Sequence, residues 1–376
     1  MTSRLLGLAV FAALAGTALC PVNAGAAQPT DLGLSADLQD ELRDSFIFVF
    51  SNDVPASETG KRAQALTTKY GGSVRYVYST ALRGFSAKMP AATAEHMVAQ
   101  NPMIAYYEAD GVAYGVGKHA SIQPQTSSQN ITRVGGPLNG TGLTAWIVDS
   151  GIDLENADLN VDVARSANFI TRGKDSPDDG HGHGTHVAGI LAAIDNEIDV
   201  VGVAAGATVV AVRVLDNDNI GPTSGVIAGV DYVAANGAPG DVVNMSLTDE
   251  PSQALDDAVT GAASLGLKFA IAAGNSTTNA SGFSPGRVEH PNVWTVSATD
   301  NDDNFMPFSN YGNPPVDCAA PGLNVPSLSI GGGVETRSGT SMSAPHVAGL
   351  LLFGTPGADG TAVGDPDGTP DPICHF

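Results

Sequence analysis

The sequence predicts an α/β protein with a doubly wound, mostly parallel sheet, preceded by a small ferredoxin-like α+β unit. From Gly142 onward, β-branched segments alternate with helical ones, and we expect strands at residues 144–148, 208–214, 242–246, 268–272 and 293–297. Such alternation is typical of βαβ units, whose strands pair in parallel with helices on both faces. The composition agrees: 43% of the 376 residues are hydrophobic, 15% are charged and 45 are glycine. This is typical of folded domains with tight turns.

The small unit is expected between residues 44 and 114. Its apolar and helical spacing indicates the order β-α-β-β-α-β, with elements at residues 46–50, 57–70, 74–78, 84–88, 91–100 and 104–108. Gly71 and Gly72 end the first helix. This order is the ferredoxin-like plan.

The first 27 residues have the features of a secretory signal peptide. Arg4 supplies the positive start, an apolar stretch follows, and small residues permit cleavage after Ala24 or Ala26. The apolar stretch is too short for a stable membrane span. We therefore expect a secreted protein without a membrane partner.

Residues 115–130 are polar and rich in Gly, Ser and Gln, which is typical of a linker. A proteolytic processing site, expected between Gly115 and Gln125, suits such a segment. The main domain is expected to span residues 131–354. The final segment, residues 355–376, is rich in Gly, Pro and Asp and is predicted to be a turn-rich tail.

The formal net charge of −22 makes nucleic acid an unsuitable partner. A solvated acidic surface that keeps a secreted monomer soluble accounts for most of these carboxylates, and calcium ligation accounts for the others. The sequence has three cysteines, Cys20, Cys318 and Cys374. Cys20 leaves with the signal peptide, so one bridge at most could form. Because Cys318 lies in an apolar, strand-like run, we expect a buried free thiol.

Three segments contain residues suited to catalysis. In the first, residues 145–153, an apolar strand leads directly into Asp149 and a glycine turn. Sites in parallel α/β sheets form at the carboxyl ends of strands, so Asp149 is placed to orient another group. Standing alone, it would more often be a turn or capping aspartate.

The second segment, residues 179–189, contains His181, His183 and His186. Zinc binding is the obvious alternative, but His183 and His186 lack the intervening Glu of the His-Glu-x-x-His motif and no third ligand is evident. Small residues follow in a helix that can pack closely on the sheet. One histidine near the helix start would face the cleft, and the others would be structural.

The third segment, residues 338–349, places Ser341 at a helix start. A nucleophilic serine needs an exposed position beside a base, and helix N-terminal amides help to hold an oxyanion. The sequence around Ser341 is not the Gly-x-Ser-x-Gly elbow of α/β-hydrolases, which disfavours an esterase.

Together, these segments closely resemble the catalytic motifs of the subtilisin/proteinase K superfamily, including the chain order Asp-His-Ser. The resemblance covers about residues 44 to 353 and implies an inhibitory prodomain followed by a subtilisin-like serine endopeptidase. It implies that Ser341 is the nucleophile, that His183 is the general base and acid, and that Asp149 orients His183. Asn275, which follows Gly274 shortly after the strand at 268–272, matches the family's oxyanion donor.

The resemblance also implies the substrate-binding residues. The 244–248 segment is similar to the family strand that pairs with the peptide, with Ser246, Leu247 and Thr248 at the primary pocket, and Ala272, Ala273 and Gly274 line the opposite wall. Relatives usually have Gly after Ser-Leu, whereas Thr248, Asp249 and Glu250 follow here. We expect these residues to narrow the rim or to charge it.

A structural calcium ion is the one cofactor that the resemblance implies. The loop at 194–202 matches the tight calcium loop of subtilisins without gaps from His183, and Asp158 matches the family carboxylate without gaps from Asp149. The implied ligands are the side chains of Asp158 and Asn196, the carbonyls of Ile194, Ile198 and Val200, and Gln125. Calcium prefers six to eight such oxygens. The alternative is an exposed, solvated acidic loop.

The sequence therefore predicts an endopeptidase that acts on proteins and peptides, is inhibited by its own prodomain and matures itself. Two other classes remain open. One is a secreted pseudo-enzyme that binds peptides on the same scaffold, although no catalytic residue is lost. The other is a zinc hydrolase that uses the histidine cluster.

Overall fold

The N-terminal unit of the computed structural model is a four-stranded antiparallel sheet covered by two helices. The structure describes residues 34–115, 128–173 and 175–376, so the signal-like leader, most of the linker and Gln125 lie outside the described residues. The unit comprises β1 (Ser45–Phe50), α2 (Thr59–Tyr70), β2 (Ser73–Tyr78), β3 (Gly84–Lys88), α3 (Ala91–Gln100) and β4 (Ile104–Ala109). The strand order β2-β3-β1-β4 confirms the predicted ferredoxin-like unit.

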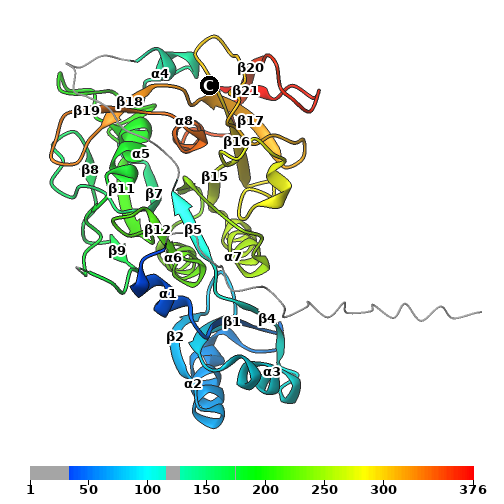
Figure 1. Ribbon diagram of the computed structural model, residues 1–376. Coiled ribbons are helices and arrows are strands. Elements are labelled where there is room, and N and C mark those ends of the chain that lie inside the picture. The colour runs from blue at the N-terminus through cyan, green and yellow to red at the C-terminus, as the bar shows by residue number, and fades with distance from the viewer. Residues whose placement is uncertain (1–33, 116–127, 174) are drawn as a thin grey trace, which may run out of the picture.

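A second, larger sheet forms the centre of the protein (Figure 1). Its strands follow the order β20-β21-β17-β16-β15-β13-β7-β11-β8, and β9 also pairs with β11. The strands are β7 (Thr144–Asp149), β8 (Asn160–Val161), β9 (Ala167–Asn168), β11 (Thr208–Arg213), β13 (Val242–Met245), β15 (Lys268–Ala272), β16 (Val293–Thr299), β17 (Val316–Pro321), β20 (Gly357–Thr361) and β21 (Pro372–His375). All pairings are parallel except β20 with β21, which confirms the predicted mostly parallel sheet.

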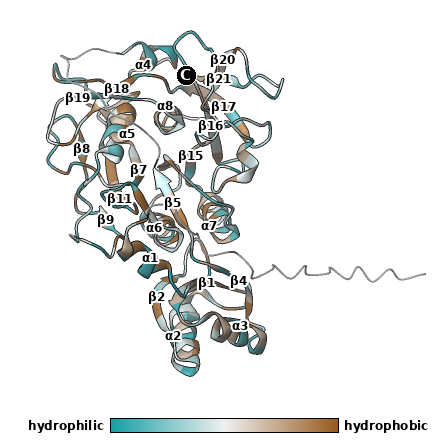
Figure 2. Ribbon diagram, viewed as in Figure 1, coloured by the Kyte–Doolittle hydropathy of each residue, from teal (hydrophilic) through white to brown (hydrophobic). Residues whose placement is uncertain are grey.

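Helices cover both faces of this sheet because successive strand residues point to opposite sides. On one face, Ile147 packs with α5 (His183–Ala192) and α8 (Thr340–Leu351). On the other face, Trp146 and Val148 pack with α6 (Thr223–Asn236) and α7 (Gln253–Ser264). Apolar residues of the central strands thus pack on both faces of the sheet, and Figure 2 colours the ribbon by the hydropathy of each residue. Burial on both faces is typical of parallel strands.

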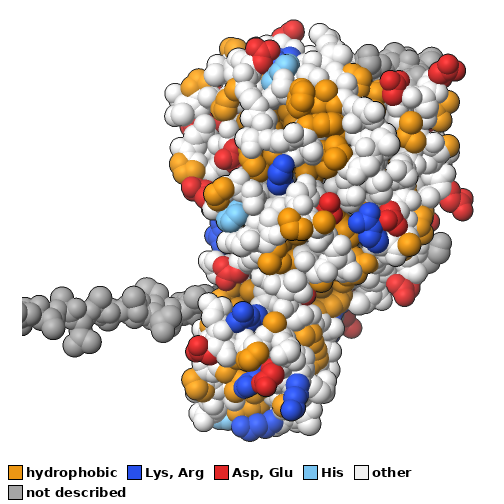
Figure 3. All heavy atoms as spheres, turned by 180° about the vertical axis from the view of Figure 1, so that it is seen from behind, with side chains coloured by type: hydrophobic (Ala, Val, Ile, Leu, Met, Phe, Trp, Pro, Cys, Tyr) orange, Lys and Arg blue, Asp and Glu red, His pale blue; other side chains and the backbone are white. Residues whose placement is uncertain are grey.

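Short elements complete the chain. They are η1 (Ala56–Glu58), β5 (Val112–Gly115), α4 (Gln129–Arg133), β6 (Leu138–Asn139), β10 (Ala204–Ala205), β12 (Ile220–Pro222), β14 (Leu247–Asp249), η2 (Ala280–Gly282), β18 (Val325–Leu328) and β19 (Val334–Arg337). Seen from behind, Asp and Glu side chains are scattered over the larger unit (Figure 3). Among the described residues, no helix has the length and apolar character needed to cross a membrane.

The C-terminal segment differs from the predicted tail. The residues of β21 extend the main sheet beyond β17, with Ala319 opposite Ile373. This pairing brings Cys318 and Cys374 to a Cα–Cα separation of 5.6 Å, and they form a disulfide. The expectation of a free thiol at Cys318 is therefore wrong, because it treated the last residues as loosely attached chain.

One helix precedes the small unit and was not predicted. It is α1 (Ala36–Leu42), whose N-terminus is capped by Ser35, since the Ser35 side chain accepts from the Leu38 amide. Leu34, Leu38 and Leu42 are buried against Val112 of β5, with Tyr114 and Ile220 packed beside them. This helix therefore lies over β5, the strand that enters the larger unit.

Candidate active site

Asp149, His183 and Ser341 lie at the carboxyl-terminal side of the parallel sheet. Asp149 is the last residue of β7, His183 is the first of α5, and Ser341 is the second of α8. All three are fully buried in the described chain. The position agrees with the rule that sites in open α/β sheets form where the strands end.

A short hydrogen bond joins the first two of these residues. His183 Nδ1 lies 2.7 Å from Asp149 Oδ1, and the Ser150 amide donates to the same oxygen at 2.7 Å. A carboxylate in this position accepts a hydrogen bond from Nδ1–H and fixes the orientation and tautomer of the imidazole, which leaves Nε2 as the acceptor.

Asp179 organises the loop before His183. One carboxylate oxygen accepts from the Gly182 amide at 2.8 Å, from the His181 amide at 2.9 Å and from the Ser150 hydroxyl at 2.9 Å. The other accepts from the Thr185 amide and hydroxyl at 2.9 and 2.6 Å. Sequence reasoning missed this role. The available signal was an acidic side chain just before a helix start, where helix amides lack partners.

The other two histidines do not join His183 in one cluster of ligands. His186 is fully buried and its Nε2 lies 3.2 Å from the Glu335 carbonyl oxygen, and burial holds its pKa well below the ordinary value. The pKa of His181 is also lowered, first by burial and then by nearby positive charge. Among the described residues, no three His, Cys, Asp or Glu side chains are arranged to hold a metal ion.

Ser341 is bonded to Ser246, the residue between β13 and β14. Its Oγ donates to the Ser246 carbonyl at 3.0 Å, and the Ser246 hydroxyl donates to the Ser341 carbonyl at 2.8 Å. The residue before α8, Gly339, has a φ of 151°. This backbone region strongly favours glycine and allows the abrupt turn that begins the helix.

Asn275 lies beside the same helix start. Its Oδ1 accepts from the Thr340 amide and hydroxyl, each at 2.9 Å. These two bonds fix the orientation of the Asn275 amide group, with its oxygen directed at Thr340. The Thr340 hydroxyl also accepts from the Gly274 amide at 3.0 Å, which connects α8 to the end of β15.

The residues expected to bind substrate lie around this site. Leu247 and Thr248 belong to β14, and Ala272 ends β15, followed by the buried Ala273. A Cβ built at Gly274 would lie 3.7 Å from Thr248 Oγ1, so the two segments face each other. Asp249 does not place a charge at the rim of the pocket, as one of the two expectations had it. Its side chain is buried and accepts from the Thr223 hydroxyl at 2.5 Å, and burial raises its pKa.

The strand that leaves the small unit, β5, fills the space between β12 and β14, which is called the groove below. β5 forms an antiparallel three-stranded sheet between β12 and β14. Tyr114 is opposite both Ile220 and Thr248, and the Gly115 amide donates to the Asn219 carbonyl at 2.8 Å. Insertion between two edge strands is a recurring mode of peptide recognition.

The residues expected to bind calcium are adjacent, apart from Gln125, which lies outside the described residues. Asp158 is fully buried and accepts from Asn196 Nδ2 at 2.8 Å and from the Val200 amide at 3.4 Å. Its backbone carbonyl accepts from the Ile194 amide at 3.0 Å, and the Asn196 side chain bonds the Ile198 amide at 3.0 Å. Burial raises the pKa of Asp158 to about 7. A buried carboxylate with amide and carbonyl oxygens nearby supplies the kind of ligand that a hard cation prefers. Asn196 here directs its amide nitrogen at Asp158, so its side chain would have to turn to present its oxygen to an ion.

Comparisons with known proteins agree on one family. The model of the Subtilase family matches residues 140–353. "Subtilisin-like protease 1" of Pseudogymnoascus destructans is 35% identical over 337 residues, which cover 84% of this chain and 80% of that protein. "Subtilisin-like serine protease AsES" of Sarocladium strictum is 32% identical, with 95% and 96% covered. A solved cold-adapted subtilisin-like serine proteinase has a TM-score of 0.58 and 36% identity, and covers 66% of this chain and 98% of its own.

Proposed function

The chain belongs to the subtilase family of serine proteases, and from this premise we propose that it is a secreted, self-maturing endopeptidase. Asp149, His183 and Ser341 form its catalytic triad. The observation that carries the proposal is the 2.7 Å bond between His183 Nδ1 and the buried Asp149, with Ser341 at the adjacent helix start.

Each residue then has one role in peptide hydrolysis. Ser341 Oγ attacks the peptide carbonyl carbon while His183 Nε2 accepts the hydroxyl proton. The oxyanion is held by the Ser341 amide and Asn275 Nδ2. His183 then donates its proton to the leaving amine, which gives an acyl-enzyme. Water, deprotonated by His183, hydrolyses the acyl-enzyme and releases Ser341.

The first experiment uses Ser341→Ala, with Ser343→Ala as the matched control. Ser343 lies two residues further along α8 and its buried hydroxyl has no hydrogen-bond partner in the described chain. We expect Ser341→Ala to accumulate the uncut precursor and to resist a serine-directed acylating reagent, detected by mass spectrometry. The Ser343→Ala variant should mature and be labelled.

The result also separates the competing functions. Normal maturation of Ser341→Ala in a host without other proteases would contradict self-processing. A purified wild-type protein that neither hydrolyses peptides nor reacts with the reagent would be a peptide-binding pseudo-enzyme. Hydrolysis that a metal chelator abolishes and the serine-directed acylating reagent leaves unchanged would indicate a zinc hydrolase.

The small unit, residues 44–114, is proposed to be the inhibitory prodomain, with residues 115–130 as the processed linker and residues 131–354 as the peptidase domain. Support comes from β5, which lies in the groove as a cleaved product would. Two prodomain carboxylates also contact helix starts of the larger unit. Glu108 accepts from the Ser252 hydroxyl at 2.5 Å, and Asp110 accepts from the Ser224 amide and hydroxyl at 2.9 and 2.6 Å.

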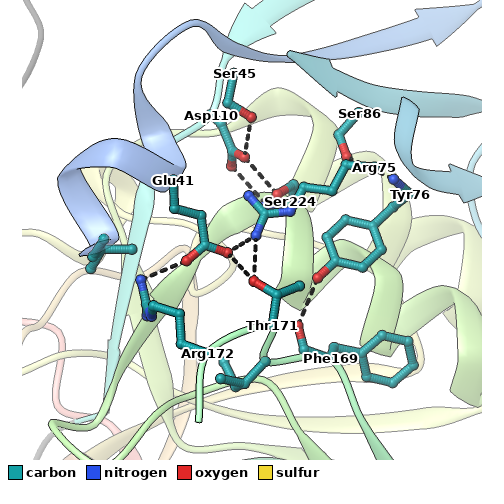
Figure 4. A network of polar contacts seen from close by, with 12 residues as sticks. Glu41, Ser45, Arg75, Tyr76, Ser86, Asp110, Phe169, Thr171, Arg172 and Ser224 are labelled. Carbon is teal, nitrogen blue, oxygen red and sulfur yellow. Dashed lines mark hydrogen bonds and ion pairs between the residues drawn. The ribbon is translucent and has the colours of Figure 1, made fainter. Parts of the chain in front are cut away.

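A polar network joins α1, the helix that precedes the small unit, to the peptidase surface (Figure 4). Glu41 of α1 contacts the guanidinium groups of both Arg75 and Arg172, the second at 2.6 Å. Thr171 donates to Glu41 at 2.9 Å. The Glu41 side chain is only 8% exposed, so these contacts are shielded from solvent screening and favour docking more than surface pairs would.

Secretion and calcium complete the proposal. Residues 1–27 are the proposed signal peptide, and the Cys318–Cys374 disulfide suits an oxidising compartment. Calcium would be held by Asp158, Asn196, the carbonyls of Ile194, Ile198 and Val200, and Gln125. The ion would supply structural stabilisation by neutralising the buried carboxylate and cross-linking two loops.

A further inference from the structure

Small and large side chains alternate along residues 111–115, which comprise β5 and the residue before it. Gly111, Ala113 and Gly115 are small, whereas Val112 and Tyr114 are large. Ala113 is fully buried in the apolar cluster of the larger unit, and Val112 and Tyr114 pack with α1. Since side chains alternate along a strand, the small residues face the peptidase groove and the large residues face the prodomain helix.

The position of Gly115 has no space for a side chain. A Cβ built there would lie 2.2 Å from Asn219 Nδ2, 2.4 Å from Oδ1 and 2.5 Å from Cγ. Non-bonded carbon atoms make their best contacts at about 3.5–4.0 Å, so the two groups would overlap. Only a displaced Asn219 could admit a residue larger than glycine.

The backbone of Asn219 is fixed from several directions. Its carbonyl accepts from the Gly115 amide at 2.8 Å, and its amide donates to the Asp216 carbonyl at 3.0 Å. The Asp216 side chain also accepts from the Asp218 amide at 2.9 Å and the Ile220 amide at 3.3 Å. Asn219 has a φ of 63° and is 4% exposed. Room for a larger substrate residue must therefore come from rotation of a confined side chain.

We propose that Asn219 is a specificity-determining residue that selects glycine at the substrate position occupied by Gly115. The preferred substrates are extended peptides with glycine there. The inference rests on the proposed function, because it takes β5 to bind as a substrate strand does.

The test compares three peptides that carry residues 108–121 of the chain, with Gly, Ala or Leu at position 115. Mature enzyme hydrolyses each, and mass spectrometry verifies that the same bond is cut. Overpacking at a confined site has a cost that corresponds to a rate loss of about tenfold or more. We therefore expect kcat/KM to fall about tenfold from Gly to Ala and further for Leu. Replacing Tyr114, which faces away from the groove, with Phe should have little effect.

The decisive variant is Asn219→Gly, because glycine adopts a positive φ without strain and removes the obstructing amide. The Ala-to-Gly ratio of kcat/KM should rise about tenfold towards equality. The control is Asn324→Gly, an exposed asparagine with a φ of 52°, which should keep the wild-type ratio. Self-cleavage of the precursor provides a second measurement, and Asn219→Ser replaces Asn219→Gly in both assays should the glycine variant fail to mature. Gly115→Ala should slow self-cleavage, and Gly115→Ala with Asn219→Gly should restore it relative to Gly115→Ala alone.

The outcomes separate this inference from the proposed function. Equal cleavage of the Gly and Ala peptides, or a ratio that Asn219→Gly leaves unchanged, would overturn the role of Asn219 while leaving the endopeptidase intact. Cleavage at a different bond in the Ala peptide would also overturn it, because the register would not be that of β5. Absence of Ser341-dependent hydrolysis for every peptide would overturn the proposed function itself.

Discussion

Asp179 is the residue whose removal tests how His183, the proposed catalytic histidine, is positioned. It accepts five hydrogen bonds around the start of α5, and a hydrogen bond to a charged group contributes about 1.5–3 kcal/mol. We predict that Asp179→Ala lowers kcat/KM at least about tenfold. The loss should fall mainly on kcat, because His183 loses its fixed orientation while the groove that binds the substrate is unchanged. Steady-state kinetics on mature enzyme and a pH–rate profile measure this.

Asp175→Ala is the matched control for that prediction, because Asp175 is exposed on the preceding loop and accepts a hydrogen bond from Asn168 at 3.1 Å. A kcat for Asp179→Ala equal to that of the control would contradict the positioning role. Partial rescue by Asp179→Asn is expected, since the amide oxygen can still accept from the loop amides while its nitrogen cannot.

At the residue scale, the sequence predicts groups whose position follows from a strand or helix end. Asp149 and Ser341 could be placed because β7 and α8 end or begin at them, and the family resemblance adds their roles. Asp179 and Asn219 could not, since their importance depends on contacts with Ser150 and Gly115, which are distant in sequence. No local pattern distinguishes such an aspartate from a common helix cap.

The helix α1 is the element that most changes the expected inhibitor. Its leucines are buried with Val112, and burying such a side chain contributes about 1.5–3 kcal/mol. We predict that residues 34–115, added in trans, inhibit mature enzyme at least about tenfold more tightly than residues 44–115. Inhibition constants measured with a peptide substrate test this, and circular dichroism checks that both fragments fold.

Within the longer fragment, Glu41→Gln isolates the charge network at the peptidase surface. Loss of the ion pair with Arg172 should raise the inhibition constant by a factor of about ten. Glu58→Gln is the control, since Glu58 pairs with Arg62 of the same unit at an exposed position. Identical inhibition by both variants and by the shorter fragment would show that α1 contributes nothing to docking.

At the element scale, sequence prediction succeeds where apolar runs are long and fails where strands are short. β3 and α3 have the predicted bounds, and the central strands agree to within two residues. The two-residue strands β8 and β9 offer no period to recognise. β21 begins at a proline, which argues locally against a strand. The strand forms because β17 has a free edge with which it can pair. The disulfide between Cys318 and Cys374 holds the two strands together.

For the whole molecule, the arrangement of the two units depends on contacts that no segment encodes alone. Ile47 and Val49 of the small sheet join the apolar cluster that contains α6 and α7. The resemblance predicts such a covering interaction, but the faces that meet are defined only after both units fold. The same holds for the loops around Asp158, which approach each other across 38 residues of chain.

That loop junction provides the test of calcium at the scale of the whole molecule. An ion that binds only the folded protein stabilises it by about 2.7 kcal/mol at a concentration of one hundred times its Kd, and this raises the Tm of a domain of this size by about 5–10 °C. We predict this rise for the uncleavable Ser341→Ala protein on going from chelator to excess calcium.

Asp158→Asn, made in the same protein, should lose most of this rise in Tm, because the buried carboxylate is the only charged ligand in the proposed set. Asp195→Asn, an exposed carboxylate in the same loop, should retain it. If calcium raised the Tm equally in all three proteins, the ion would bind somewhere other than at Asp158. If calcium left the Tm unchanged, the proposed calcium site would be wrong.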